Sequence, residues 1–193
     1  MTKHRYALII EYLGTNFAGS QIQPGQRTVQ SELEQALGIL LRQEVKTVFA
    51  GRTDAGVHAL GQVAHFDTDN ELDGYRFIHS LNALTPDEIS VKAIKEVDFS
   101  FHSQKSAKYR WYRYVINNRP SPSILLKDIS LHLHRPLDVA AMQRALDYTL
   151  GEHDFSAFKR SNTTNPAKVC NMIFAHCRNF SGILYIDLIA NRF

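Results

Sequence analysis

Strand-like and helix-like segments alternate along this chain of 193 residues, but without the regular spacing of repeated β-α-β units. Residues 6–12 (YALIIEY) and 89–97 are rich in the aliphatic and aromatic residues that are typical of strands. Residues 29–42 place their apolar side chains on one helical face, and Thr28 is the expected N-cap. This irregular order favours an α+β fold with a mostly antiparallel sheet and helices on one side.

The rest of the sequence predicts the other strands and helices of this fold. Further strands are predicted at 45–50, 62–66, 107–116, 131–133, 169–177 and 183–190. Short helices should follow Asp73 and Asp138, with Gly151 at the C-terminal stop of the second. Cys170 and Cys177 lie in one predicted strand, an odd number of residues apart. We therefore expect them to point to opposite faces and to remain reduced.

Composition narrows the class of protein. The formal charge of +3 is compatible with a nucleic-acid partner, but it is weak evidence by itself. The chain has neither an apolar run of membrane-spanning length nor a signal-peptide pattern after Met1. We expect a cytoplasmic protein that has no membrane association.

The densest group of chemically active residues is the segment Ala50–Ala59, which strand-like segments flank on both sides. Gly51 and Gly56 allow sharp bends and close approach, while Arg52, Asp54 and His58 stand between or beside them. Arginine binds phosphate or positions a carboxylate, and aspartate acts as a nucleophile or base. The alternative is an ordinary turn, in which aspartate and glycine are also common.

A second candidate is the strand-like segment 108–114 (KYRWYRY). Alternation places Lys108, Arg110, Tyr112 and Tyr114 on one face and Trp111 on the other. A sheet face that mixes cations with aromatic rings suits RNA, because bases stack on rings and phosphates pair with cations. An amphipathic strand with tyrosines at the edge of a core explains the pattern equally well.

Other groups favour neither a metal nor a cofactor. His132 and His134 share a strand face, but no third ligand is near them in the sequence, so we expect no metal site. Phosphate-cradling glycine motifs and a serine-hydrolase elbow are both missing, and we expect no cofactor. Lys159, Arg160 and Lys168 form a loose basic group that could contact an RNA backbone or simply be solvated.

Four segments together resemble the tRNA pseudouridine synthase A family. The most specific is Gly51–Ala59 (GRTDAGVHA), and residues 110–114 (RWYRY) resemble the family's Arg-x-Tyr-x-Tyr strand. Residues 151–158 (GEHDFSAF) and 189–193 (IANRF) match in the same order. The resemblance extends from about Tyr6 to the last residue.

The resemblance implies isomerisation of uridine to pseudouridine at tRNA positions 38 to 40, in the anticodon stem–loop, without a cofactor or metal. It implies that Asp54 is the catalytic carboxylate, that Tyr112 stacks on the target base and that Arg52 helps hold the flipped-out geometry and the phosphate. It also implies a homodimer with tRNA spanning both subunits. The expected fold is two halves that resemble RNA-recognition modules and meet at a catalytic cleft, here residues 1–103 and 104–193.

Three departures qualify the resemblance. The family's Gly-Trp-Gln reads Gly19-Ser20-Gln21, and its Leu-Pro pair reads Thr85-Pro86. Family members also continue past Phe193 with an arginine that pairs with the catalytic aspartate. Because a partly buried Asp54 without that partner would tend to protonate, we expect low activity from the chain as printed. The alternatives are a truncated, non-catalytic RNA-binding relative and a glycosidase, although the latter needs two opposed carboxylates.

Overall fold

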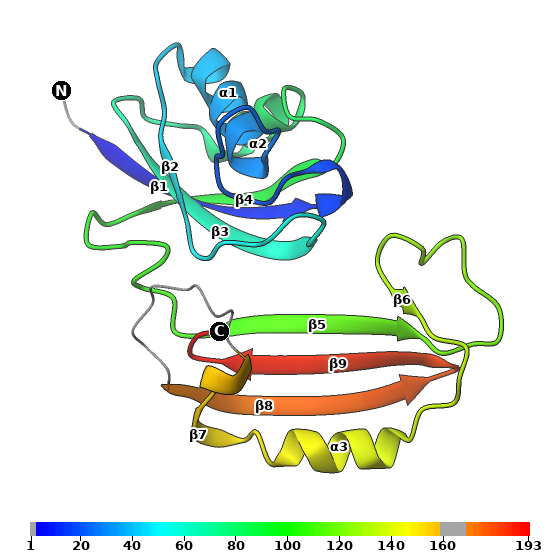
Figure 1. The fold of residues 1–193 in the computed structure, drawn as a ribbon. Coiled ribbons are helices and arrows are strands. Elements are labelled where there is room, and N and C mark those ends of the chain that lie inside the picture. Colours follow the sequence, from blue (N-terminus) through cyan, green and yellow to red (C-terminus); the bar gives the residue numbers. More distant parts are fainter. Residues whose placement is uncertain (1–2, 159–168) are drawn as a thin grey trace. The chain divides into compact units, whose positions relative to one another are not determined.

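The computed structural model describes residues 3–158 and 169–193, and the chain divides into two compact units, Met1–Ala107 and Lys108–Phe193 (Figure 1). Each consists of a sheet with helical cover on one face, and within the described residues every strand pair except one is antiparallel. The predicted α+β class is confirmed.

The first unit is a four-stranded sheet with two helices. Its sheet order is β2-β3-β1-β4, and α1 and α2 cover one face (Figure 1). In chain order the elements are β1 (His4–Tyr12), a 3-10 turn (Gly14–Asn16), α1 (Val29–Leu41), β2 (Thr47–Phe49), β3 (Ala59–Thr68), α2 (Gly74–Asn82) and β4 (Ile89–Val97).

Local sequence explains where the first unit's helices begin. Thr28 Oγ1 accepts a hydrogen bond from the Ser31 amide, and Ser31 Oγ accepts one from the Thr28 amide, which completes a capping box. Asp73 caps α2 by accepting from the Arg76 amide. Both predicted caps are confirmed. Alternate residues of β1 pack under the helices in one continuous core, in which Leu8, Ile10, Leu33 and Leu37 are fully buried.

The opposite face of this sheet holds a segment that we call the strap, residues 98–106. Arg5 donates to the carbonyl oxygens of Phe99 and Phe101 at 2.9 and 2.8 Å, and it binds Asp67 through two hydrogen bonds. Buried His65 lies 2.9 Å from the Ser103 hydroxyl, measured from Nδ1, and accepts from the Ser103 amide. These contacts fix the strap across β1 and β3.

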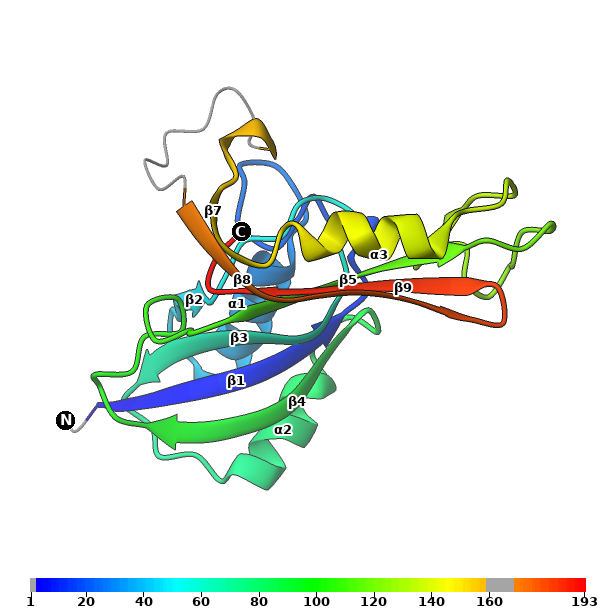
Figure 2. The ribbon, with the colours of Figure 1, turned by 90° about the horizontal axis from the view of Figure 1, so that it is seen from below.

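The second unit is a sheet of order β6-β5-β9-β8-β7, and among its residues 108–158 and 169–193 the short β5–β6 pair alone is parallel. Helix α3 lies along β8 on one face (Figure 2). The elements are β5 (Arg110–Asn117), β6 (Leu131–His132), α3 (Val139–Asp147), β7 (Gly151–Asp154), a 3-10 turn (Ser156–Phe158), β8 (Val169–Phe180) and β9 (Ile183–Ala190).

Two expectations for this unit were wrong. Cys170 and Cys177 are both buried on the face that carries α3, because the register against β9 shifts between Met172 and Phe174 and resets the alternation. Both thiols are free, and burial raises the pKa of Cys177. Gly151 does not stop the helix, since α3 ends at Asp147 and Gly151 begins β7 with φ of +92°.

Candidate active site

The first group of predicted site residues lies on the loop that joins β2 to β3, which we call the site loop (residues 50–58). The two strands are paired antiparallel, and the Ala50 amide donates to the Val63 carbonyl oxygen at 2.7 Å. The loop therefore leaves a rigid sheet end, the usual setting for functional side chains on loops.

A neighbouring loop, residues 13–22, holds the middle of the site loop through Thr53. The Ser20 amide donates to the Thr53 carbonyl oxygen at 3.0 Å, and the Thr53 amide donates to Ser20 Oγ at 2.8 Å. The hydroxyl of Tyr12 lies 2.8 Å from Thr53 Oγ1. Ser20 and Tyr12 are buried, so Thr53 is fixed to the core on both its backbone and its side chain.

Close backbone contact also joins these loops. A Cβ added at Gly14 would lie only 2.0 Å from the Val57 carbonyl oxygen, so glycine is required there. The Gly14 amide donates to His58 Nδ1 at 3.1 Å. His58 thus contacts the backbone of the neighbouring loop at the same point.

The two glycines of the motif differ in what they require. Gly56 has φ of +79°, a conformation that favours glycine, and the Val57 amide closes the turn on the Asp54 carbonyl oxygen at 3.2 Å. Gly51 lies outside the left-handed region, and a Cβ there would meet no atom within 4 Å. Its carbonyl oxygen accepts from Gln62 Nε2 at 2.9 Å, which anchors the start of the loop.

Asp54 and Arg52 both project from this fixed loop into solvent. Neither side chain has a hydrogen-bond partner among residues 3–158 and 169–193. The partial burial expected for Asp54 is not found, because its side chain is exposed. The arrangement therefore presents one carboxylate and one guanidinium, two residues apart, on a loop that is fixed to the core through Thr53.

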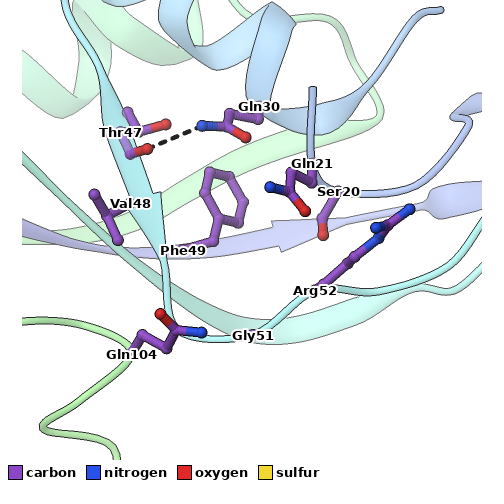
Figure 3. Close-up of a pocket in the computed structure, with 9 residues that line it drawn as sticks. All are labelled: Ser20, Gln21, Gln30, Thr47, Val48, Phe49, Gly51, Arg52 and Gln104. Carbon is purple, nitrogen blue, oxygen red and sulfur yellow. Dashed lines mark hydrogen bonds between the residues drawn. The ribbon is translucent and has the colours of Figure 1, made fainter. Parts of the chain in front are cut away.

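A pocket of about 290 Å³ lies beside Arg52 (Figure 3). Its lining comes from the site loop, β2, the loop 13–22, α1 and the strap, and includes Ser20, Gln21, Gln30, Phe49, Arg52 and Gln104. Asp54 is not part of this lining.

The second group of predicted residues belongs to the second unit. Strand β5 begins at Arg110 rather than at 107, so Lys108 precedes the strand and alternation does not assign it to a face. Arg110, Tyr112 and Tyr114 share the face of Ile116, which is buried beside α3. Arg110 donates to the Asn191 carbonyl oxygen at 2.7 Å, and the Tyr112 ring meets Phe193 edge-on at 4.8 Å.

The opposite face of β5 contains a polar group that sequence reasoning missed. Buried Asp187 of β9 accepts from Trp111 Nε1 at 2.8 Å and from Arg113 Nε and Nη2 at 2.7 and 3.1 Å. Burial alone would raise the pKa of Asp187, but the hydrogen bonds from Arg113 and Trp111 outweigh it and lower the pKa. The Arg113 guanidinium lies over the rings of both Trp111 and Tyr185.

Remaining candidates add no site. In the described part of the chain no three His, Cys, Asp or Glu side chains gather as metal ligands, and His132 Nε2 instead lies 3.0 Å from the Arg119 carbonyl oxygen. Lys159, Arg160 and Lys168 lie outside the described residues. No helix within residues 3–158 and 169–193 has the length and apolarity to span a membrane.

Comparison with known proteins identifies the family. Residues 8–106 match the sequence model of a family described as tRNA pseudouridine synthase. The tRNA pseudouridine synthase A of Acetivibrio thermocellus is 47% identical over 162 residues, which are 84% of this chain and 66% of that protein. That of Methylococcus capsulatus is 40% identical over 189 residues, 98% of this chain and 70% of the relative. The chain belongs to the tRNA pseudouridine synthase family.

The match covers only part of each relative. The matched region spans 66% of the Acetivibrio protein and also 66% of the tRNA pseudouridine synthase A of Rippkaea orientalis, to which the chain is 40% identical.

Proposed function

We propose that this chain acts in the isomerisation of uridine to pseudouridine in the anticodon stem–loop of tRNA, with Asp54 as the catalytic carboxylate. The observation that carries the proposal is an exposed Asp54 directly after Thr53, whose side chain and backbone are fixed by buried Tyr12 and Ser20, respectively. Preorganisation of this kind is what a nucleophile or base requires. The relatives named tRNA pseudouridine synthase A support the same substrate class.

The reaction requires little besides a carboxylate and a means of holding RNA. The N1–C1′ bond of the target uridine breaks, C5 bonds to C1′, and the proton lost from C5 is balanced by the proton gained at N1. Asp54 attacks either the sugar or the base, which must first leave the stack. No redox partner is needed, since the product is an isomer of the substrate.

The other named residues hold the RNA in this proposal. Arg52 binds phosphate beside Asp54, and the exposed guanidinium is suited to bidentate contact. Tyr112 stacks on the target base, with Arg110 and Lys108 on the backbone. Gly51, Gly56 and His58 maintain the shape of the loop. We further propose that two copies of the protein act together on one tRNA, as the family resemblance implies.

The test is pseudouridine formation in an unmodified tRNA transcript, mapped by chemical labelling and primer extension. Asp54→Ala and Asp54→Asn should each lower the rate by more than about 10³-fold, because the attacking group is lost. Because Asp54 is exposed and has no partner in the described residues, tRNA affinity measured by fluorescence anisotropy should change less than about twofold.

Two results would contradict the proposal in different ways. Turnover by Asp54→Ala at the wild-type rate would remove Asp54 from the chemistry. Tight tRNA binding by the wild type with no product would favour the RNA-binding relative that the sequence also allows.

A further inference from the structure

The pocket beside the site loop has polar side chains at its mouth and a fixed floor (Figure 3). Its volume of about 290 Å³ is just below the usual range for small-molecule sites, so the pocket suits one nucleotide rather than a larger ligand. Arg52 is the only charged residue in the lining, and every lining residue lies in the described part of the first unit.

The floor is preformed by hydrogen bonds within the protein. Gln30 donates through Nε2 to the Thr47 carbonyl oxygen and to Glu34, both at 2.9 Å, and its Oε1 accepts from the Ile22 amide. Ser20 is fully buried and bound to Thr53. The hydrogen bonds of these side chains are satisfied within the protein, and they give the pocket a stable shape.

The mouth is different, because Gln21 and Arg52 are exposed and have no side-chain partner within residues 3–158 and 169–193. A carboxamide both donates and accepts hydrogen bonds, as a base edge or a ribose hydroxyl requires. A guanidinium matches a phosphate. Figure 3 shows the Phe49 ring between the Thr47 and Val48 side of the pocket and the Gln21 side, where it provides an aromatic surface.

We propose that this pocket binds a nucleotide of the substrate RNA that directly neighbours the target uridine, with its phosphate on Arg52 and its base edge on Gln21. The inference rests on the proposed function. Arg52 and Asp54 are two residues apart, so their backbones lie within about 7 Å of each other. A strand whose target nucleotide reaches Asp54 therefore passes the pocket mouth at an adjacent nucleotide.

The experiment measures the affinity of the full chain for a fluorescent anticodon stem–loop hairpin. Gln21→Ala should weaken binding by about 5- to 10-fold, the value of one good hydrogen bond. Gln26→Ala is the matched control, because Gln26 is an exposed glutamine between the loop 13–22 and α1 and lies outside the pocket lining. It should change affinity less than about twofold. Thermal unfolding of both variants should match the wild type, since neither glutamine is buried.

Hairpins that lack the base at one position next to the target complete a double-mutant cycle. At the position whose base occupies the pocket, loss of the base should weaken binding to the wild type. Gln21→Ala should then cause no further loss of affinity for that hairpin. Purely additive losses at both neighbouring positions would overturn the subsite, as would equal effects of Gln21→Ala and Gln26→Ala. Such results would leave wild-type binding and turnover intact, whereas failure of the proposed function would remove turnover from the wild type itself.

Discussion

The two groups of predicted site residues are held in different ways. Asp54 and Arg52 lie on a loop that is fixed by a few contacts to Tyr12, Gly14 and Ser20, residues distant in the sequence. Tyr112, in contrast, lies within β5, where eight consecutive residue pairs with β9 set its backbone. The carboxylate proposed to attack the substrate therefore lies on the first kind of support, and the ring proposed to stack on the base lies on the second.

The two kinds of support should differ in how strongly a single substitution displaces the functional group. The site loop is held by a few separate contacts. A change at one distant residue can therefore displace the functional group, because no equivalent contact replaces the one that is lost. On the strand the ladder is redundant, so removal of a single side chain leaves the backbone in register. The sharpest tests therefore pair a substitution near the loop with one on or beside the strand.

Among the substitutions that test the supports rather than Asp54 itself, Gly14→Ala should have the largest effect. The new Cβ would lie 2.0 Å from the Val57 carbonyl oxygen, so the site loop must move. Misplacement of a catalytic group by about 1 Å costs about 10²-fold in rate, and we expect a loss of that order in pseudouridine formation. In the wild type the Thr53 amide donates to Ser20 Oγ, so faster hydrogen exchange of this amide in the variant would report the displacement directly.

Matched substitutions show whether this effect belongs to the loop. Gly38→Ala in α1 adds the same methyl group, but its nearest contact is 3.5 Å, and helix propensity favours alanine. Val115→Ala removes atoms from β5 while the ladder remains. Both should retain activity within about threefold. A Gly14→Ala protein with wild-type turnover would show that the loop is not held as tightly as its contacts imply.

The second expected effect concerns the support of β5. Asp187→Asn removes a buried negative charge that binds Arg113 and Trp111, and should destabilise the second unit by about 1.5–3 kcal/mol. Trp111 is the chain's only tryptophan, so its fluorescence in a urea titration reports this unit. Asp67→Asn is the counterpart in the first unit. Since the Asp67 side chain is 39% exposed, its loss should cost about 1 kcal/mol or less. Equal costs at the two positions would contradict the distinction between a buried and a partly exposed pair.

Sequence reasoning predicted the elements of both units well, because periodicity and capping residues are local signals. Ile89–Val97 was predicted without error in its bounds, and Thr28, Asp73 and Asp138 cap the helices expected after them. The errors arose where tertiary contacts decide. The bulge in β8 that puts both cysteines on one face is set by pairing with β9, which the strand's own residues do not reveal.

The candidate site shows the same division. The motif around Asp54 is contiguous and was visible in the sequence, but the exposure of its carboxylate was not. The contacts from Tyr12 and Ser20 to Thr53 join residues 41 and 33 positions apart, and no local pattern predicts them. Asp187 was missed for the same reason, since a single aspartate in an apolar strand identifies no partner until β9 pairs with β5.

The smallest expected effect is a difference between the two units in how their stability depends on pH. Burial lowers the pKa of His65, and nearby Arg5 and His102 lower it further, while Asp67 opposes them. The unfolded chain therefore binds this proton more readily than the folded one. The contribution of neutral His65 is complete above its ordinary pKa of about 6.5 and is lost as the pH falls below it. In the second unit the pKa of Asp187 is lowered, so its contribution to stability is present above the ordinary carboxylate range, near pH 4, and is lost below it.

Between pH 8 and pH 5.5 the first unit should therefore lose stability through His65, while the contribution of Asp187 to the second unit stays intact. The loss should appear first at the strap, because the Ser103 amide donates to the nitrogen of His65 that would take up the proton. Hydrogen exchange of that amide should accelerate as the pH falls, after correction for intrinsic rates. In His65→Asn, which keeps an acceptor but cannot titrate in this range, the acceleration should disappear. If it persisted in His65→Asn, another group would control the strap, and His65 would be only a packing residue between β3 and the strap.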